Sequence, residues 1–415
     1  MRFARLALLP LVVAAACTRT VATAPTPSTA PVPRLAVVEA LVPAPPIAVG
    51  LDPELPARLD SIVRVGLEQG AAPGAALAVG RFGRLVHLKG YGAIDYAAGA
   101  PTTDPTSIYD LASLTKVVAT TTAAMILEEE GKLDLSRTVQ SYLPEFDAPD
   151  KAPITVRMLL THRGGLEAFA PLWRDTKGRT EYLTQINTRP LRGAPGTLVV
   201  YSDWDFVLMG LIIERITGTT LDAFTAARVF GPLGMSSTRF SPDTTNAALR
   251  SRLVYTALDT LRGQLHGSVH DPNAWALGGV AGHAGLFGSA RDLAVFAQML
   301  LNGGTYAGTR IVKPTTVARW TTSQDPASSR ALGWDSPSAV SSAGRYFSPR
   351  SFGHTGYTGT SMWVDPERGL FVVLLMNRVN SRGEATRHVQ LRRDVADAVQ
   401  SSLRDAPLID WEARR

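Results

Sequence analysis

Ser113 and Lys116 are the two side chains of this sequence that are best spaced for covalent chemistry. They stand three positions apart at the start of a predicted helix, so the hydroxyl and the amine lie on one face, about one turn apart. A neutral amine in that place can take the hydroxyl proton and make the serine a strong nucleophile. Lysine is scarce in the chain, and Lys116 alone among the lysines has a serine three positions before it. The pair predicts nucleophilic catalysis by Ser113.

Tyr201 and Asp203 form a Tyr-x-Asp motif directly before another predicted helix. The anion of a phenol is stabilised beside an ammonium group, so Tyr201 is suited to passing protons between Ser113 and a leaving group. Taken alone, Tyr201 has an alternative role as a half-buried core aromatic. Asp203 has an alternative role as the N-cap of the helix expected near Phe206, although capping and catalysis are compatible.

A third motif, His354-Thr355-Gly356, stands shortly before a predicted strand. Glycine at a strand lets a substrate backbone approach the strand edge closely. The backbone N–H of Tyr357, together with that of Ser113, would form an oxyanion hole with two donors. The alternative for His354 is a hydrogen bond within a neighbouring loop.

Simpler interpretations compete with these sites. Ser113 alone would be explained as a helix cap, but the companion motifs favour catalysis. The histidines at 266, 270 and 283 match no standard zinc spacing and have no cysteine near them. We expect them to make loop hydrogen bonds around a glycine-rich pocket wall, and we predict neither a metal nor a cofactor.

The composition sets the size and class of the folded part. The chain has 415 residues, of which 45% are hydrophobic and 19% charged. That is enough for one large domain, or two intergrown ones, around a substantial core. The net charge of +6 comes from dispersed arginines, with no basic stripe between aromatic residues. We therefore expect no nucleic-acid partner.

The first residues have the pattern of an export signal. Arg2 and Arg5 precede an apolar stretch over 6–16 that is too short to span a bilayer, and Cys17, the only cysteine, follows it. The segment 1–17 resembles a bacterial lipoprotein signal, in which the cysteine is lipidated and becomes the mature N-terminus. The alternative is an ordinary secretory signal cut near this point. Both predict an exported protein, periplasmic or at the cell surface, and the first adds a lipid anchor in a bacterial membrane.

A Pro-, Ala- and Thr-rich segment over 18–50 shows neither helical nor strand periodicity. Such a composition predicts a semi-extended tether. Folding should begin near Leu51, so we expect one domain over 51–405 and a C-terminal tail over 406–415. Because no second cysteine is present, its stability must come from packing.

Strands are predicted at both ends of this domain, with helices between them. Apolar periodicity and turn signals give strands over 75–80, 85–91, 361–364 and 370–376, and helices over 53–69, 114–130, 156–160, 206–217, 221–230, 292–301 and 384–403. This order predicts an α+β fold, with one antiparallel sheet formed from both chain ends, flanking helices and an inserted, mainly helical region. We expect the active site between the sheet and the insert.

The motifs and their order resemble the serine β-lactamase and penicillin-binding-protein family, in particular its class C branch. That branch contains class C β-lactamases, D-alanyl-D-alanine carboxypeptidases and related esterases. Further matching segments lie at 159–166, 269–271, 282–287 and 292–304. The resemblance implies an acylated nucleophile, an activating amine, a proton-transferring phenol and an oxyanion-hole N–H at Ser113, Lys116, Tyr201 and Tyr357.

Two positions depart from the family pattern that the resemblance implies. Asp203 stands where asparagine is usual, and His354 stands where the β-lactamases usually have lysine. Lysine is charged at pH 7, whereas histidine, with a reference pKa of about 6.5, is mostly neutral. Both changes weaken the attraction for a substrate carboxylate and so favour neutral esters or amides. An ion contact between Asp203 and Lys116 would also raise the pKa of the amine and oppose its role as a base.

These inferences together predict an exported serine hydrolase that acts through an acyl-enzyme on an ester or amide, of the esterase or D-alanyl peptidase type. Its substrate would be a small molecule or a peptide, which includes fragments of the cell wall. A β-lactamase proper is one alternative, and a non-hydrolytic penicillin-binding or cell-wall-binding module is another. The retention of Tyr201 and Lys116 argues against the binding module, because a pure binder has no use for both.

Overall fold

The structure is a computed structural model that describes residues 40–339, 341–380 and 386–414. The predicted export signal over 1–17, with Cys17, and most of the predicted tether over 18–50 lie outside these ranges. Within the part that the structure describes, no helix has the length and apolar character that crossing a membrane requires.

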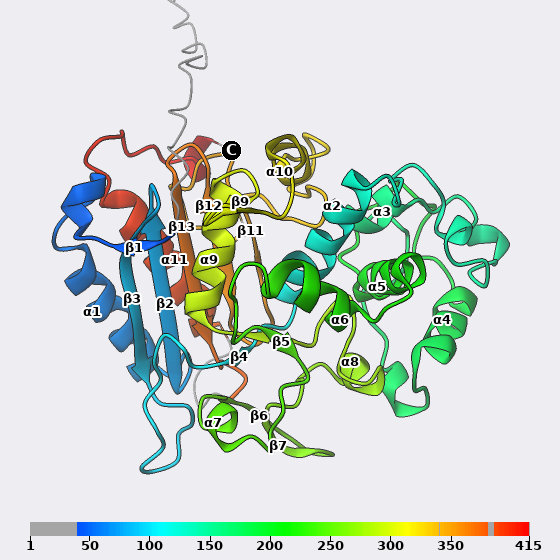
Figure 1. The fold of residues 1–415 in the computed structure, drawn as a ribbon, viewed down its shortest axis with the longest axis horizontal. Helices are drawn as coiled ribbons and strands as arrows, with labels where there is room; N and C mark the ends of the chain where they lie inside the picture. The colour runs from blue at the N-terminus through cyan, green and yellow to red at the C-terminus, as the bar shows by residue number, and fades with distance from the viewer. Residues whose placement is uncertain (1–39, 340, 381–385, 415) are drawn as a thin grey trace, which may run out of the picture. The chain divides into compact units, whose positions relative to one another are not determined.

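The central sheet joins the two ends of the domain (Figure 1). Its strands lie in the order β1-β3-β2-β13-β12-β11. Their bounds are Val42–Pro43 for β1, Gly74–Arg81 for β2, Arg84–Gly92 for β3, Phe352–Thr355 for β11, Ser361–Asp365 for β12 and Leu370–Met376 for β13. All neighbours are antiparallel except β1 and β3, which are parallel. The predicted α+β fold, with a sheet built from both chain ends, is confirmed.

The edge strand β1 lies inside the segment that the composition assigns to a tether. Val42 and Pro43 are paired with Arg84 and Leu85 of β3, and a 3-10 turn follows over Pro46–Val49. Proline lacks a backbone N–H, so it is tolerated at a sheet edge, where one side of the strand needs no partner. A proline-rich segment can thus add to a sheet without a strand periodicity, and the folded part begins before Leu51.

Helices cover both faces of this sheet. α1 (Leu55–Glu68) and α11 (Arg387–Ser401) pack together on one face, and α9 (Ala290–Leu301) covers the other (Figure 1). Alternate residues of β2 belong to two cores: Leu77 packs with the α1 and α11 side chains, whereas Ala78 packs with those of α9. Strands buried on both faces are apolar nearly throughout, which explains why β2 and β13 show little alternation.

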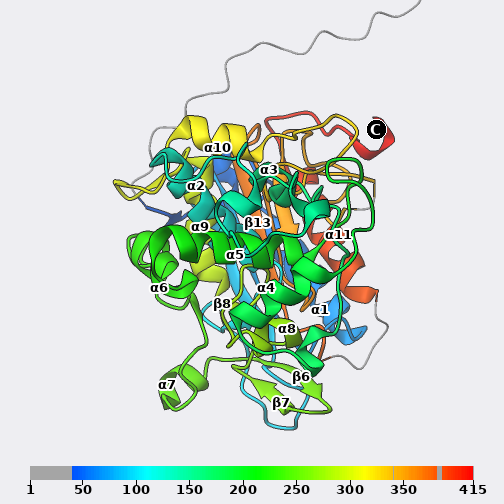
Figure 2. The same ribbon diagram turned by 90° about the vertical axis from the view of Figure 1, so that its right-hand side faces the viewer.

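A mainly helical region lies beyond α9, on the side of the molecule away from α1 (Figures 1 and 2). Its helices are α2 (Thr122–Glu129), α3 (Val156–Leu160), α4 (Arg179–Thr188), α5 (Asp203–Thr217), α6 (Leu221–Thr225) and α8 (Pro272–Ala276). Smaller elements are α7 (Ala247–Arg250), α10 (Pro314–Thr321), β4 (Tyr109–Asp110), β5 (Arg239–Phe240), β6 (Tyr255–Asp259), β7 (Gly263–His266), β8 (Leu286–Gly288), β9 (Thr305–Tyr306) and β10 (Thr309–Arg310).

The helix predicted over 114–130 is not a single α-helix. Its first part, Lys116–Thr121, is a π-helix, and α2 continues it. The Thr122 hydroxyl donates to the Val117 carbonyl at 2.9 Å inside this widened turn. Apolar periodicity cannot distinguish a π-turn from an α-turn over so short a stretch. Such turns are frequent at functional sites, and this one lies directly behind Ser113.

Candidate active site

Ser113 lies in a tight turn between β4 and the π-helix. The residue before it, Ala112, has a φ of 45°, in the left-handed region that costs energy for a residue with a side chain. The Asp110 carboxylate accepts a hydrogen bond from the Ala112 N–H at 2.8 Å and so holds the turn. The strained turn fixes the Ser113 side chain at the N-terminal end of the helix.

The Lys116 ammonium lies behind Ser113 and is fully buried. Its Nζ donates to Ser113 Oγ at 3.0 Å, to Asp203 Oδ1 at 2.8 Å and to the His283 carbonyl at 3.3 Å. The structure therefore brings the serine–lysine pair and Asp203 together. The anticipated ion contact between Asp203 and Lys116 is present.

The charge of Lys116 is set by two opposing effects. Burial lowers the pKa of the ammonium, but the Asp203 carboxylate and the Tyr201 phenol raise it by more, and the pKa lies above its ordinary value. Lys116 is consequently protonated at neutral pH. It must pass a proton to another group before it can accept the proton of Ser113.

Tyr201 and Asp203 are positioned by the start of α5. This helix begins at Asp203, earlier than the predicted start at Phe206, and its cap is Ser202, whose hydroxyl accepts from the Trp204 N–H at 3.2 Å. The capping role considered for Asp203 is wrong, because Ser202 performs it. The Asp203 side chain is left to reach Lys116. The Tyr201 ring centroid lies 4.8 Å from the Lys116 Nζ, so the phenol shares the same site.

The end of β11 forms another side of the site. His354 Nδ1 lies 2.8 Å from the Thr355 carbonyl, which fixes Nδ1 as the hydrogen-bond donor and leaves Nε2 as an acceptor. Nε2 is buried and has no partner among the described residues. Burial, with smaller effects from Arg330 and Lys116, lowers the pKa of His354 to about 3. Position 354 therefore presents a neutral acceptor.

Gly356 lets the turn after β11 lie against the turn that carries the nucleophile. A Cβ at this position would come within 2.1 Å of Thr360 Oγ1 and 2.4 Å of the Leu111 carbonyl, so no larger residue fits. The hydroxyl of Thr358 donates to the Asp110 carbonyl at 2.6 Å and fastens the two turns. Close backbone approach, rather than a positive φ, is the reason for glycine here.

Two backbone donors remain for a ligand. The N–H groups of Ser113 and Tyr357 hydrogen-bond to no residue in the described part of the chain. Both residues line one cavity of about 690 Å³, which also receives Tyr201, Asp203 and the segment 354–356. All predicted site residues except the buried Lys116, and Cys17 outside the described ranges, thus open onto the same space.

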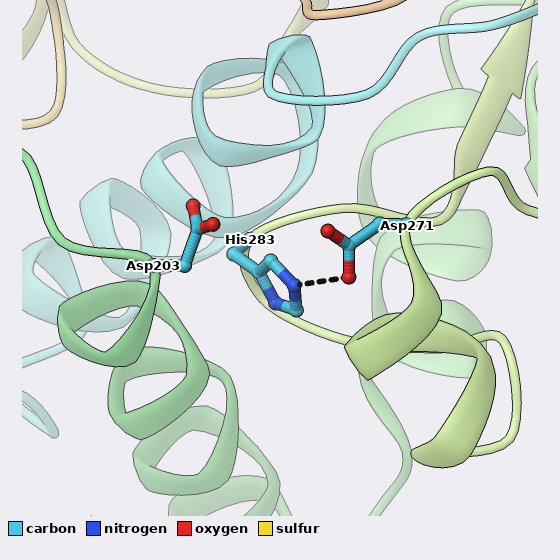
Figure 3. A group of neighbouring side chains, drawn as sticks. All are labelled: Asp203, Asp271 and His283. Atoms are coloured by element: carbon cyan, nitrogen blue, oxygen red, sulfur yellow. Dashed lines mark hydrogen bonds and ion pairs between the residues drawn. The ribbon is translucent and has the colours of Figure 1, made fainter. Parts of the chain in front are cut away.

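Asp271 and His283 also line this cavity, and the sequence predicted no catalytic or binding role for either (Figure 3). Asp271 caps α8 by accepting the Ala274 N–H at 2.7 Å, and His283 Nε2 contacts the same oxygen at 2.9 Å. The signal was present in the sequence, because both residues lie in segments that match a subgroup of the family. The expected loop hydrogen bonding of His283 is confirmed.

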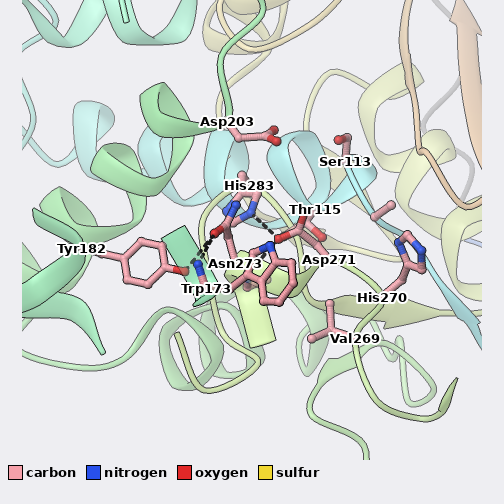
Figure 4. Close-up of polar contacts among 12 residues, drawn as sticks. Ser113, Thr115, Trp173, Tyr182, Asp203, Val269, His270, Asp271, Asn273 and His283 are labelled. Atoms are coloured by element: carbon pink, nitrogen blue, oxygen red, sulfur yellow. Dashed lines mark hydrogen bonds and ion pairs between the residues drawn. The ribbon is translucent and has the colours of Figure 1, made fainter. Parts of the chain in front are cut away.

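Buried contacts fix the position of these two side chains (Figure 4). Asn273 in α8 is fully buried and accepts from the Tyr182 hydroxyl at 2.9 Å and from the Trp173 N–H at 3.1 Å. Gly282 lies so close to α5 that an added Cβ would meet the Phe206 carbonyl at 2.0 Å. Both segments are therefore held rigidly against the helical region.

Arginines also line the cavity and were not identified from the sequence. They are Arg330, Arg378 and Arg392. Arg392 is buried and donates to the Gly356 and Thr360 carbonyls at 2.8 Å, so its function is to hold the turn after β11. The Arg330 guanidinium lies 5.1 Å from the Tyr201 ring centroid. Its ion pair with Asp335 is long, with 3.9 Å between the nearest nitrogen and oxygen. Arg330 thus faces the cavity with a weakly paired charge.

The three histidines considered for a metal do not gather in one place. His266 in β7 contacts the Leu253 carbonyl at 3.0 Å and lies outside the catalytic cavity, whereas His270 and His283 line it. A different group, Asp203, Asp271 and His283, offers one ligand atom each within 4.8 Å of one another (Figure 3).

Comparison with known proteins identifies the family to which this site belongs. The model of the beta-lactamase family matches residues 59–397. A Salmonella agona protein named "Putative D-alanyl-D-alanine carboxypeptidase" is 33% identical over 82% of this chain and 87% of its own length. An Escherichia coli K12 protein of the same name is 34% identical over 74% and 79%. A class C beta-lactamase structure has the same fold, with a TM-score of 0.70 at 18% identity over 86% of this chain and 98% of its own.

The chain therefore belongs to the beta-lactamase family and is a serine hydrolase. The predicted family and the predicted enzyme class are confirmed by the same findings.

Proposed function

We propose that this protein is an exported serine hydrolase that forms an acyl-enzyme at Ser113 and releases D-alanine, or a related amino acid, from the carboxyl end of a peptide. The observation that carries the proposal is the contact of Ser113 Oγ with a buried Lys116 that is itself paired with Asp203, all beside one cavity. The pattern of an export signal over 1–17 supports a place in the periplasm or at the cell surface.

Acylation begins with a proton relay. Lys116 first gives a proton to Asp203, its hydrogen-bond partner at 2.8 Å, and becomes a neutral amine. The amine then takes the proton of Ser113 as Oγ forms a bond to the substrate carbonyl carbon. A proton transfer along one short hydrogen bond is the step that reconciles a charged lysine at rest with a basic one in the reaction.

The oxyanion formed in this step takes the electron pair of the carbonyl bond. The free N–H groups of Ser113 and Tyr357 are the donors that stabilise it, in a site where the surrounding turns are already fixed. When the carbonyl reforms, the bond to the leaving group breaks and that group takes a proton through Tyr201. Water then attacks the acyl carbon, oriented by Tyr201 and Lys116, which accept its proton. The bond to Ser113 Oγ breaks, Oγ takes that proton back, and Asp203 returns its proton to Lys116 as the acid product leaves.

The substrate preference for a peptide with a terminal carboxylate depends on Arg330. From the sequence, Asp203 and His354 were expected to weaken the attraction for a substrate carboxylate and so to favour neutral esters. In the structure, Arg330 supplies a cation beside Tyr201 and His354. Relatives at 33% and 34% identity that carry a carboxypeptidase name support the same direction. A guanidinium is well suited to a carboxylate, because it can bind both oxygens at once.

The test combines labelling with a choice of substrates. A fluorophosphonate probe is expected to label Ser113, and Ser113→Ala should abolish labelling and reduce kcat by about 10³-fold or more. A peptide ending in D-Ala-D-Ala, a p-nitrophenyl ester and a chromogenic cephalosporin are then compared by kcat/KM, and the peptide should be preferred. Full activity in Ser113→Ala would refute the nucleophile, and one acylation event without turnover would favour the binding module.

A further inference from the structure

Two carboxylates of the cavity have an oxygen that no protein group uses. Asp203 and Asp271 expose 19% and 21% of their side chains to the cavity. In each, Oδ1 makes the contacts described above, with Lys116 or with Ala274 and His283. Neither Oδ2 accepts a hydrogen bond from a residue that the structure describes. The site therefore offers two unused acceptors near the nucleophile.

Asp271 is ionised, and the ring that it contacts has a further unused atom. Burial raises the pKa of Asp271, but the contacts with His283 and Ala274 lower it further, to about 2, so this carboxylate is ionised. His283 is 1% exposed, contacts Asp271 through Nε2 and has no partner for its buried Nδ1 among the described residues, so the cluster holds a further polar atom that no protein group uses. The Lys116 ammonium contacts the Asp203 carboxylate and makes no hydrogen bond to Asp271.

We propose that Asp203 and Asp271 form a subsite for a primary ammonium group carried by the acyl part of the substrate. One carboxylate oxygen of Asp203, one of Asp271 and one ring nitrogen of His283 lie within 4.8 Å of one another. An ammonium nitrogen with two charge-assisted hydrogen bonds of about 2.8 Å at the tetrahedral angle bridges oxygens about 4.6 Å apart. This inference rests on the proposed function, because the acyl part is defined by the reaction at Ser113.

An ammonium fits this cluster better than a metal ion does. Zinc bonds to oxygen and nitrogen are about 2.0–2.2 Å long, and tetrahedral ligands then lie only about 3.4 Å apart. The Lys116 Nζ, 2.8 Å from Asp203 Oδ1, would also repel a dication more strongly than a monocation. The spacing and the neighbouring charge both favour a single positive charge that donates hydrogen bonds.

The arginines define the orientation of such a substrate. Asp203 and Asp271 come from α5 and from the start of α8, whereas Arg330 and Arg378 come from segments that flank β11 and β13. A carboxylate on the leaving group faces the arginines, so the acyl part faces the aspartates. The substrate class is then a short peptide with a free amine close to the scissile carbonyl and a free carboxylate beyond it.

Binding of the ammonium would also affect the base. A cation shared by Asp203 withdraws part of the negative charge that holds the proton on Lys116. The pKa of Lys116 is raised mainly by this carboxylate against the effect of burial, so the lysine would move toward its neutral form when such a substrate binds. The same contact would recognise the substrate and promote the first proton transfer.

The test compares one peptide with and without its positive charge. H-D-Ala-D-Ala and its N-acetyl derivative are measured with the full-length protein by release of D-alanine. The free amine should be preferred about 10- to 100-fold in kcat/KM, as expected for a charged hydrogen bond of about 1.5–3 kcal/mol. Asp271→Asn should reduce this preference to about threefold or less, and asparagine can still cap α8.

Asp243→Asn is the matched control. Asp243 is an exposed carboxylate that accepts from the Thr245 N–H and hydroxyl outside the catalytic cavity, so its loss should leave the preference unchanged. Equal rates for the two peptides, or the same preference in Asp271→Asn, would overturn the subsite. Zinc binding by calorimetry that disappears in Asp271→Asn would overturn it in favour of a metal.

Binding to Ser113→Ala separates this inference from the proposed function. Calorimetry with the two peptides requires no turnover, and the free amine should bind more tightly than the acetylated form. If the wild type hydrolyses neither peptide but this difference persists, the subsite stands and the proposed reaction fails. If hydrolysis occurs but neither rate nor affinity depends on the amine, the subsite fails and the reaction stands.

Discussion

The two sides of the catalytic cavity differ in charge and in the way that their side chains are held. On the side of the helical region, Asp203 and Asp271 are anionic, and each is fixed by short contacts to buried groups. On the side of β11, His354 is neutral, and the positive charge comes from Arg330, which has only a weak ion pair. Carboxylates that are fixed before the substrate binds are suited to discriminating between substrates, whereas a weakly paired guanidinium is available to bind a ligand.

The turn that carries Ser113 is hydrogen-bonded to both sides of the cavity through Asp110. One oxygen of Asp110 accepts from Ala112 beside Ser113, and the other accepts from the His270 N–H at 2.7 Å. The Asp110 carbonyl accepts from Thr358 in the turn after β11. This one residue therefore couples the acidic side, the nucleophile and the oxyanion turn, and each coupling can be broken separately.

Among changes to the two sides of the cavity, removal of the positive charge at Arg330 should have the largest effect. Arg330→Gln is expected to reduce kcat/KM for a D-Ala-D-Ala peptide by about 100-fold, mainly through KM, because a charged hydrogen bond to the carboxylate is lost. The p-nitrophenyl ester, which has no such carboxylate, should lose little.

Two controls define that result. Arg330→Lys should recover part of the affinity, because it restores charge without the bidentate geometry. Arg157→Gln removes an exposed arginine that contacts Gln324, outside the cavity, and should have no effect. Equal losses for the peptide and the ester would show that Arg330 acts through the position of Tyr201 and not through the substrate.

Removal of the negative charge at Asp203 tests the acidic side. In the wild type this carboxylate helps to keep the pKa of Lys116 above its ordinary value, so activity should rise with pH as the lysine loses its proton. In Asp203→Asn the largest effect that raises that pKa is lost, so the rising limb of the kcat/KM profile for the p-nitrophenyl ester should move to lower pH. Asparagine cannot accept the lysine proton, so the plateau of the profile should fall. When each protein is scaled to its own plateau, the variant should exceed the wild type at pH 6 by about tenfold.

The ester is chosen because it carries no ammonium group for the subsite. An Asp271→Asn variant is the comparison, since Asp271 makes no hydrogen bond to Lys116 and its loss should leave the limb nearly in place. An unchanged or upward-shifted limb in Asp203→Asn would mean that Lys116 is not the group that limits acylation.

The same contrast explains what could be predicted from the sequence. Sheet strands such as 370–376 and helices such as 156–160 were predicted because local periodicity and stop signals specify them. Ser113, Lys116 and Tyr201 lie in short motifs with defined spacing. Asp271 lies in a segment that resembles the family but has no recognised role there, and Arg330 carries no local signal. Long-range packing brings both residues to the cavity from remote segments.

Electrostatic state was the hardest property to infer. The neutrality of His354 was anticipated from its reference pKa, but its cause in the structure is burial, which residue type does not reveal. The expectation of neutral substrates did not take Arg330 into account. This residue is distant from Tyr201 along the chain, although the two lie side by side in the structure. Charge at a site is a sum over neighbours, so it becomes predictable only when the neighbours are known.

The smallest expected effect is that of a substitution at Asp110, and it is measured as a change in the free energy of unfolding. Asp110→Asn keeps one acceptor but turns an amide N–H toward the other backbone donor, so the free energy of unfolding should fall by about 1 kcal/mol at pH 7. Burial raises the pKa of Asp110 to about 6 in the folded protein, above the unfolded value of about 3.9. A raised carboxyl pKa means that ionisation costs stability, which the wild type loses as pH rises from about 4 through 6.

The asparagine variant has no such ionisation, so the difference in unfolding free energy between the two proteins should be larger at pH 4 than at pH 7. Urea denaturation at both values measures it, and subtraction removes the titration of every other group that the two proteins share. A difference that grows toward neutral pH would mean that the two N–H groups, from Ala112 and His270, hold the carboxylate ionised in spite of burial. Asp110 would then act as a charged link between the nucleophile and the acidic side, and the coupling of the two sides would be electrostatic as well as geometric.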